Sequence, residues 1–85
     1  MYIHLGEQIT VHDHDVIGIF DLENTTIGPD TRGLLNRLEQ QKRVVNITNE
    51  MPKSFVLCKD GKLGEIAYVS PISAATLRKR AVKLF

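Results

Sequence analysis

Hydrophobic and polar residues follow short repeating patterns in the first half of the chain. Polar and apolar residues alternate over residues 8–11, which predicts a half-buried strand after a first short strand at 2–5. A continuous apolar run at 16–20 is consistent with a central strand. Pro29 is suited to the first turn of a helix that we expect to run to about Lys42. Leucines at 34, 35 and 38 mark the apolar face of this helix.

The second half predicts three further strands and a second helix. The expected strands cover residues 44–47, 54–58 and 65–69, and the middle one is apolar enough to be buried on both faces. The Asp60-Gly61 pair lies between two such strands, which is a strong hairpin signal. We interpret Gly64 as a bulge and Gly33 as a weak point of the first helix that allows close approach of another backbone. The order of elements predicts one α+β domain over residues 1–85, a small mostly antiparallel sheet with two helices.

The expected C-terminal helix begins near Pro71 and separates charge from apolar surface. One stripe consists of Ala74, Leu77, Ala81, Leu84 and Phe85, and the opposite face of Thr76, Lys79, Arg80 and Lys83. Arg78 falls inside the apolar arc, where it needs a partner, a path to solvent or another chain. The basic face is either a phosphate-contacting patch or an ordinary solvated face, and the pattern alone favours the second.

Charge is distributed unevenly over the 85 residues, although the net charge is only +1. Residues 1–30 hold six acidic residues and no lysine or arginine, whereas residues 31–85 hold all 11 basic residues with four acidic ones. This asymmetry fits a polyanion such as DNA, or the acidic half of a second copy in a head-to-tail assembly. A third interpretation is that folding brings the two halves together and their charges cancel.

Composition excludes several classes of protein. The 42% hydrophobic content is too high for a disordered chain, and no apolar stretch approaches a membrane span. The N-terminal residues lack the features of a signal peptide, so we expect a cytoplasmic protein with no membrane partner. A domain this small, with a single cysteine and therefore no internal disulfide, can gain stability by forming a homo-oligomer.

Candidate chemistry is sparse. His12 and His14 point to one side of an extended segment that also carries carboxylates, and His4 is a conceivable third ligand. Two close imidazoles do not complete a metal site, so we expect no metal and no cofactor. Cys58 reads as an inert core thiol. With no nucleophile elbow and no phosphate loop, we predict no catalytic residue, no small-molecule substrate and no enzymatic activity.

Several segments together resemble the RemA/RemB group of regulators of bacterial extracellular-matrix genes, most closely the RemB branch. The resemblance covers residues 1 to about 81 and depends on the order and spacing of its pieces rather than on one diagnostic motif. The matching segments are Met1–Gly6, Val16–Asp21, Pro52–Val56, Tyr68–Ser73 and Thr76–Ala81.

This resemblance implies a DNA-binding activator of biofilm matrix operons. The RemA branch is similar to LytTR-type DNA-binding domains and builds rings that could wrap DNA. Its arginines tied to DNA contact correspond here to His14 and to Glu50-Met51. We therefore expect weak backbone contacts from each subunit, summed over an oligomer. The alternative is a self-assembling interaction protein that modulates another regulator without touching DNA. The candidate DNA-binding residues are Lys53, Arg43, Arg78, Lys79, Arg80 and Lys83.

Overall fold

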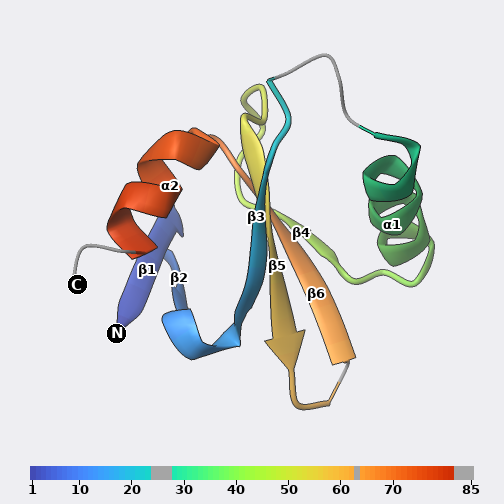
Figure 1. Ribbon diagram of the computed structural model, residues 1–85, viewed down its shortest axis with the longest axis horizontal. Coiled ribbons are helices and arrows are strands. Elements are labelled where there is room, and N and C mark those ends of the chain that lie inside the picture. The colour runs from blue at the N-terminus through green and yellow to red at the C-terminus, as the bar shows by residue number, and fades with distance from the viewer. Residues whose placement is uncertain (24–27, 63, 82–85) are drawn as a thin grey trace.

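The computed structural model has an α+β fold, as the sequence predicts, with six strands and two α-helices among its described residues (Figure 1). It describes residues 1–23, 28–62 and 64–81. A single turn of 3-10 helix, η1, lies between the second and third strands. The elements are β1 (Tyr2–Gly6), β2 (Ile9–His12), η1 (Asp13–Asp15), β3 (Val16–Asp21), α1 (Pro29–Gln40), β4 (Val44–Asn46), β5 (Ser54–Asp60), β6 (Gly64–Ser70) and α2 (Ala74–Ala81).

The strands form two sheets rather than one. β1 and β2 make a two-stranded antiparallel sheet, and the other strands make a four-stranded sheet in the order β3-β5-β6-β4. The expectation of a single sheet is therefore corrected to two, and the strand pairings are mostly antiparallel, as predicted, with β4 pairing in parallel with β6 as the exception. The cause is α1, which carries the chain from one edge of the sheet to the other, so that β4 runs in the same direction as β3.

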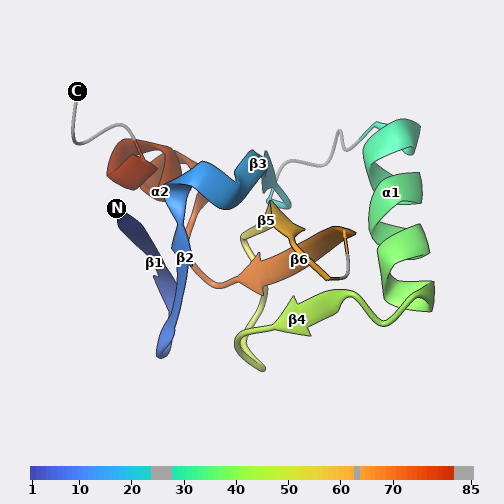
Figure 2. The same cartoon turned by 90° about the horizontal axis from the view of Figure 1, so that it is seen from below.

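Three layers result, with α1 on one side of the four-stranded sheet and β1, β2 and α2 on the other (Figure 2). β5 lies between these layers and is buried on both faces, as predicted. Because side chains alternate along a strand, Phe55 and Leu57 pack toward α1, whereas Val56 and Cys58 pack toward β1, β2 and α2. The Phe55 ring stacks on Phe20 of β3 with ring centroids 4.6 Å apart.

β3 is an edge strand, which corrects the expectation that the apolar run 16–20 lies at the centre of the sheet. Val16 pairs with Cys58 and Gly18 with Leu57, so Ile17 is an extra residue in the ladder. Its side chain is 53% exposed. The run is apolar because its residues reach both cores, Val16 and Ile19 on one side and Phe20 on the other.

The predicted hairpin joins β5 and β6 in continuous register from Ser54–Ser70 to Asp60–Gly64. No register shift occurs at Gly64, so the predicted bulge is wrong there. Instead Gly64 has a φ of 88°, a conformation that favours glycine at the end of a tight turn. In α1, a side chain at Gly33 would meet open space, and no backbone of the described residues makes the predicted close approach to it. Leu38 of α1 is buried and Leu34 and Leu35 pack against the same core, as predicted.

Two buried serines position α2. The hydroxyl of Ser70 donates to the carbonyl of Leu5 in β1, and it accepts from the backbone N–H of Ile72 at 3.0 Å. The hydroxyl of Ser54 donates to the carbonyl of Ile72 at 2.7 Å. Ser73 then accepts from the N–H of Thr76 and caps the helix. These bonds fix the segment before α2 onto β1 and β5, and so determine where the basic helix lies.

Candidate nucleic-acid interface

The basic residues of α2 lie in its last turn, where cations are favourable against the partial negative charge of a helix C-terminus. Ala74 and Leu77 are buried and Ala81 packs on the same core, which confirms the apolar stripe as far as the structure describes it. Lys79 is exposed and is the clearest phosphate-contact candidate on the helix. Lys83, Leu84 and Phe85 lie outside the described residues.

The two arginines of α2 bind backbone carbonyls of two different sheets. Arg78 donates from Nη2 to the carbonyl oxygen of Ile19 in β3 at 2.9 Å. Arg80 donates from Nη1 to the carbonyl oxygen of His4 in β1 at 2.7 Å. Each guanidinium has five N–H donors, so one such bond leaves others for phosphate oxygens. Arg78 thus has the partner that its position in the apolar arc requires, and Arg80 has a structural role besides its charge.

Lys53 lies on the same end of the sheet as the start of α2. Its side chain is exposed, while its backbone N–H donates to the carbonyl of Ser70 and its carbonyl accepts from Leu22. The neighbouring Ser54 holds Ile72, two residues before α2. Lys53 therefore lies beside the segment that leads into α2, whereas the basic residues of α2 lie in the last turn of that helix.

Arg43 lies away from this group. Its guanidinium lies 3.5 Å from the place that a Cβ at Gly64 would take, at the hairpin end of β6. Lys53 is bonded to Ser70 at the other end of the same strand. Six residues of extended strand separate Gly64 from Ser70, a distance of about 20 Å. Within one subunit, the candidate residues therefore do not form a single continuous basic band.

The turn before β5 carries Glu50 and Met51, and Lys53 is its one basic residue. Met51 is 84% exposed, and the neighbouring Glu50 donates its N–H to the Thr48 hydroxyl at 3.2 Å. Met51 and Lys53 line a pocket of about 530 Å³ together with Leu22. The sequence analysis missed this pocket, because it joins the end of β3 to a turn some 30 residues later. Its only signal in the sequence was a methionine, Met51, within a polar turn.

Comparison with known proteins identifies the family. A scan of protein-family models gave no match. The chain is, however, 38% identical over all of its 85 residues to Extracellular matrix regulatory protein B of Bacillus subtilis (strain 168), and the match covers 95% of that protein. This chain belongs to the RemB family. The relative is named as a regulatory protein, which points to a non-enzyme. Neither helix of the described residues is long and apolar enough to span a membrane.

In this RemB-family chain, the residues of the histidine segment contact one another and not only solvent. The ligand atoms of His12, Asp13 and His14 all lie within 4.8 Å of one another. His12 Nδ1 accepts from the backbone N–H of His14 at 3.2 Å and lies 3.0 Å from Asp13 Oδ1. His4, the conceivable third histidine, lies near Glu7 instead, with its Nε2 2.7 Å from the Glu7 carbonyl oxygen. Three ligands fall short of the four of a structural zinc site, and the absence of a metal requirement stays a prediction.

Cys58 is buried in the core, as expected for an inert thiol. Burial raises its pKa to about 11, and the charge of Asp15 adds to the shift. At neutral pH the side chain is therefore the neutral thiol, which is a poor nucleophile. The chemistry of Cys58 gives no support to a catalytic role.

Proposed function

We propose that this RemB-family chain regulates bacterial extracellular-matrix genes in the cytoplasm by binding DNA as a ring-shaped homo-oligomer. The observation that carries the proposal is the 38% identity, over the full chain, to an extracellular matrix regulatory protein. A likeness to LytTR-type DNA-binding domains and a role in biofilm formation are parts of the same proposal.

The geometry favours contact with the DNA backbone rather than with bases. Lys79 is exposed, and Arg78 keeps guanidinium donors beyond the one bonded to Ile19. Lys53 borders the segment that leads into this helix. Such side chains neutralise phosphates without reading sequence. Because each subunit supplies few cations, affinity has to come from repetition of the patch around an oligomer.

The test is a DNA shift assay on the purified oligomer over a salt series, with two duplexes of unrelated sequence. We expect binding at ~50 mM salt that falls steeply as salt rises, with similar slopes for both duplexes. Failure of the intact oligomer to bind either duplex at ~50 mM salt would overturn the DNA-binding part of the proposal. The extracellular-matrix family assignment would stand in that case.

A second candidate function is a self-assembling interaction protein that modulates another regulator without contacting DNA. The specific observation in its favour is the pocket around Met51, at the turn where the resemblance places DNA-contacting arginines. Exposed methionine is adaptable and common on protein-binding surfaces. Replacing Met51 with lysine discriminates the two: DNA binding should be kept or strengthened under the first function, and binding to a regulator lost under the second.

A further inference from the structure

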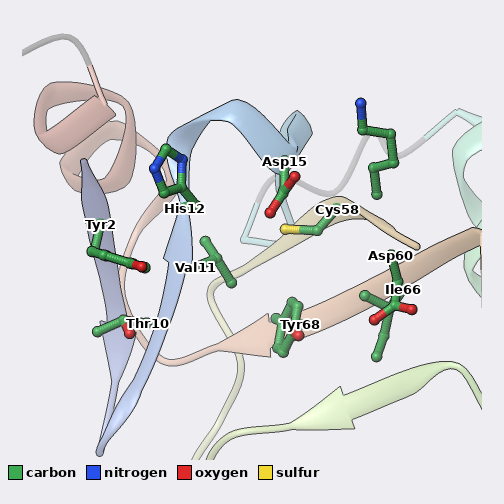
Figure 3. A pocket seen from close by; sticks show the side chains of 10 residues that line it. Tyr2, Thr10, Val11, His12, Asp15, Cys58, Asp60, Ile66 and Tyr68 are labelled. Atoms are coloured by element: carbon green, nitrogen blue, oxygen red, sulfur yellow. The ribbon is translucent and has the colours of Figure 1, made fainter. Parts of the chain in front are cut away.

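A second pocket, of about 360 Å³, lies on the side of the molecule formed by β1, β2 and the β5–β6 pair (Figure 3). Its volume is within the range of about 300–1,000 Å³ that is usual for small-molecule sites. Its walls come from segments far apart in the sequence, with Tyr2 and His12 from the small sheet and Tyr68 from β6. None of its residues belongs to the proposed DNA-binding surface.

Aromatic rings form much of the wall. Tyr2 pairs with His12 across β1 and β2, and their rings meet edge to face with centroids 5.1 Å apart. Tyr2 is 69% exposed, so its ring is accessible to a ligand. Tyr68 contributes a half-buried ring on the opposite wall (Figure 3). Faces of tyrosine rings attract cations, including the ammonium and guanidinium groups of ligands.

The charged groups at the pocket are mainly acidic. Asp15 of η1 and Asp60 of β5 both line it, and the Asp15 carboxylate lies beside the Cys58 thiol (Figure 3). Burial raises the pKa of the Tyr68 phenol, and the Cys58, Asp60 and Asp15 groups raise it further. The charges of both carboxylates therefore reach the Tyr68 ring in the wall of this pocket. Cys58 lines the pocket without adding charge, because its thiol stays protonated at neutral pH.

Lys59 is the one lysine or arginine among the described residues that line this pocket, and His12 adds an imidazole. It lies between Cys58 and Asp60 on β5, and alternation along a strand directs its side chain to the face opposite theirs. Asp60 accepts the backbone N–H of Lys62 through Oδ1 at 2.8 Å. Asp60 thus has a structural role at the hairpin as well as a place in the pocket wall.

We propose that this pocket binds an organic cation, an ammonium or guanidinium group on an alkyl stem, between the rings of Tyr2 and Tyr68 and the carboxylate of Asp15. Two sources carry this chemistry: a free small amine, or the arginine or lysine side chain of another protein molecule. In either case the cation is bound rather than transformed. The site is independent of DNA binding and adds a ligand-responsive surface to the chain.

The chain offers a direct readout, because it contains two tyrosines, both in this pocket, and no tryptophan. Intrinsic tyrosine fluorescence therefore reports on the site alone. We expect n-butylguanidinium, a small alkyl guanidinium, to produce a saturable change that n-butanol at equal concentration does not produce. N-acetylarginine amide distinguishes the sources. Affinity equal to that of n-butylguanidinium indicates a protein side chain as the natural occupant, whereas much weaker binding indicates a free small cation.

Asp15→Asn is the test variant, since Asp15 is exposed and its replacement is compatible with folding. We expect it to weaken n-butylguanidinium binding roughly tenfold, as loss of one close opposite charge implies. Glu39→Gln is the matched control, because it removes one exposed acidic charge on α1, across the sheet from the pocket, and should leave the affinity unchanged. The proposal is overturned if neither cation gives a saturable signal, or if Glu39→Gln weakens binding as much as Asp15→Asn does.

Discussion

Arg80 of α2 donates a hydrogen bond to the carbonyl oxygen of His4 in β1, joining two residues 76 positions apart in the chain. Arg78 makes the equivalent bond to Ile19 of β3. The helix therefore binds strands of both sheets through two of the residues that the sequence analysis named as candidates for DNA contact. Arg78 and Arg80 therefore have a structural role in addition to their charge. The exposed Lys79 contributes its charge alone.

Replacing Arg80 with methionine should destabilise the fold. The variant keeps the apolar stem and removes the donors to the His4 carbonyl, so we expect a loss of about 1 kcal/mol in the free energy of unfolding. Lys79→Met is the control, because an exposed side chain without such a bond should change stability by less than about 0.5 kcal/mol. Urea denaturation of both variants measures the difference. Equal stability of the two would show that the Arg80 bond contributes nothing.

Lys53→Ala should weaken DNA binding similarly on duplexes of different sequence and reduce the salt slope by about one unit. The reason is that an exposed lysine contacts phosphate without reading bases. Lys62→Ala is the matched control, since Lys62 is equally exposed but lies at the hairpin end of β6, away from α2. An unchanged affinity and slope for Lys53→Ala would mean that the assigned surface is wrong.

Local pattern was enough to predict the elements with strong sequence signals. Ser54–Cys58 was identified as a strand buried on both faces, and Asp60-Gly61 as the hairpin after it. The pairing of strands within the sheets was harder to infer from sequence. The apolar run of β3 resembles a central strand because its side chains reach two cores, and nothing in the run reveals that only one neighbour pairs with it.

The candidate sites show the same limit. The basic helix was located from its composition, but its bonds to His4 and Ile19 depend on how two sheets pack against it. The position of Arg43 follows from β4 pairing in parallel with β6, which sequence pattern did not indicate. Tyr2 and Tyr68 meet at one pocket only because β1 folds over the β5–β6 pair, so no local motif could reveal it.

Chelation should leave stability unchanged. His12, Asp13 and His14 lie close together, but their atoms already bond to one another and three ligands do not complete a structural site. We expect the same melting temperature with and without a strong chelator. A fall of several degrees on chelation would show that the segment holds a structural metal.

Stability should fall as pH rises above about 9 in a way that depends on Cys58. The folded protein holds the Cys58 proton up to its pKa of about 11, whereas the unfolded chain releases it near the ordinary thiol pKa of 9.0. Between these values the folded state binds more protons, so stability decreases with pH, by at most about 1.4 kcal/mol per pH unit for one proton. Cys58→Ala should flatten the profile between about pH 9 and pH 11, as urea denaturation would show. A profile as steep as that of the original protein would place the titrating group elsewhere, Tyr68 being the next candidate.

The protein should be a homo-oligomer whose assembly involves the exposed edge of β3. The domain is small, acidic residues dominate its first 30 positions, and Ile17 projects from the edge strand with 53% of its surface exposed. A charge at this position should oppose contact with another chain, so Ile17→Lys should lower the mass measured by light scattering at micromolar concentration. Met51→Lys places the same charge at the turn before β5 and serves as the comparison, with no expected change in mass.

A stable monomer of the unaltered chain at micromolar concentration would refute assembly altogether. If Met51→Lys disrupts the oligomer and Ile17→Lys leaves it intact, the contact between subunits lies at the Met51 pocket rather than at β3.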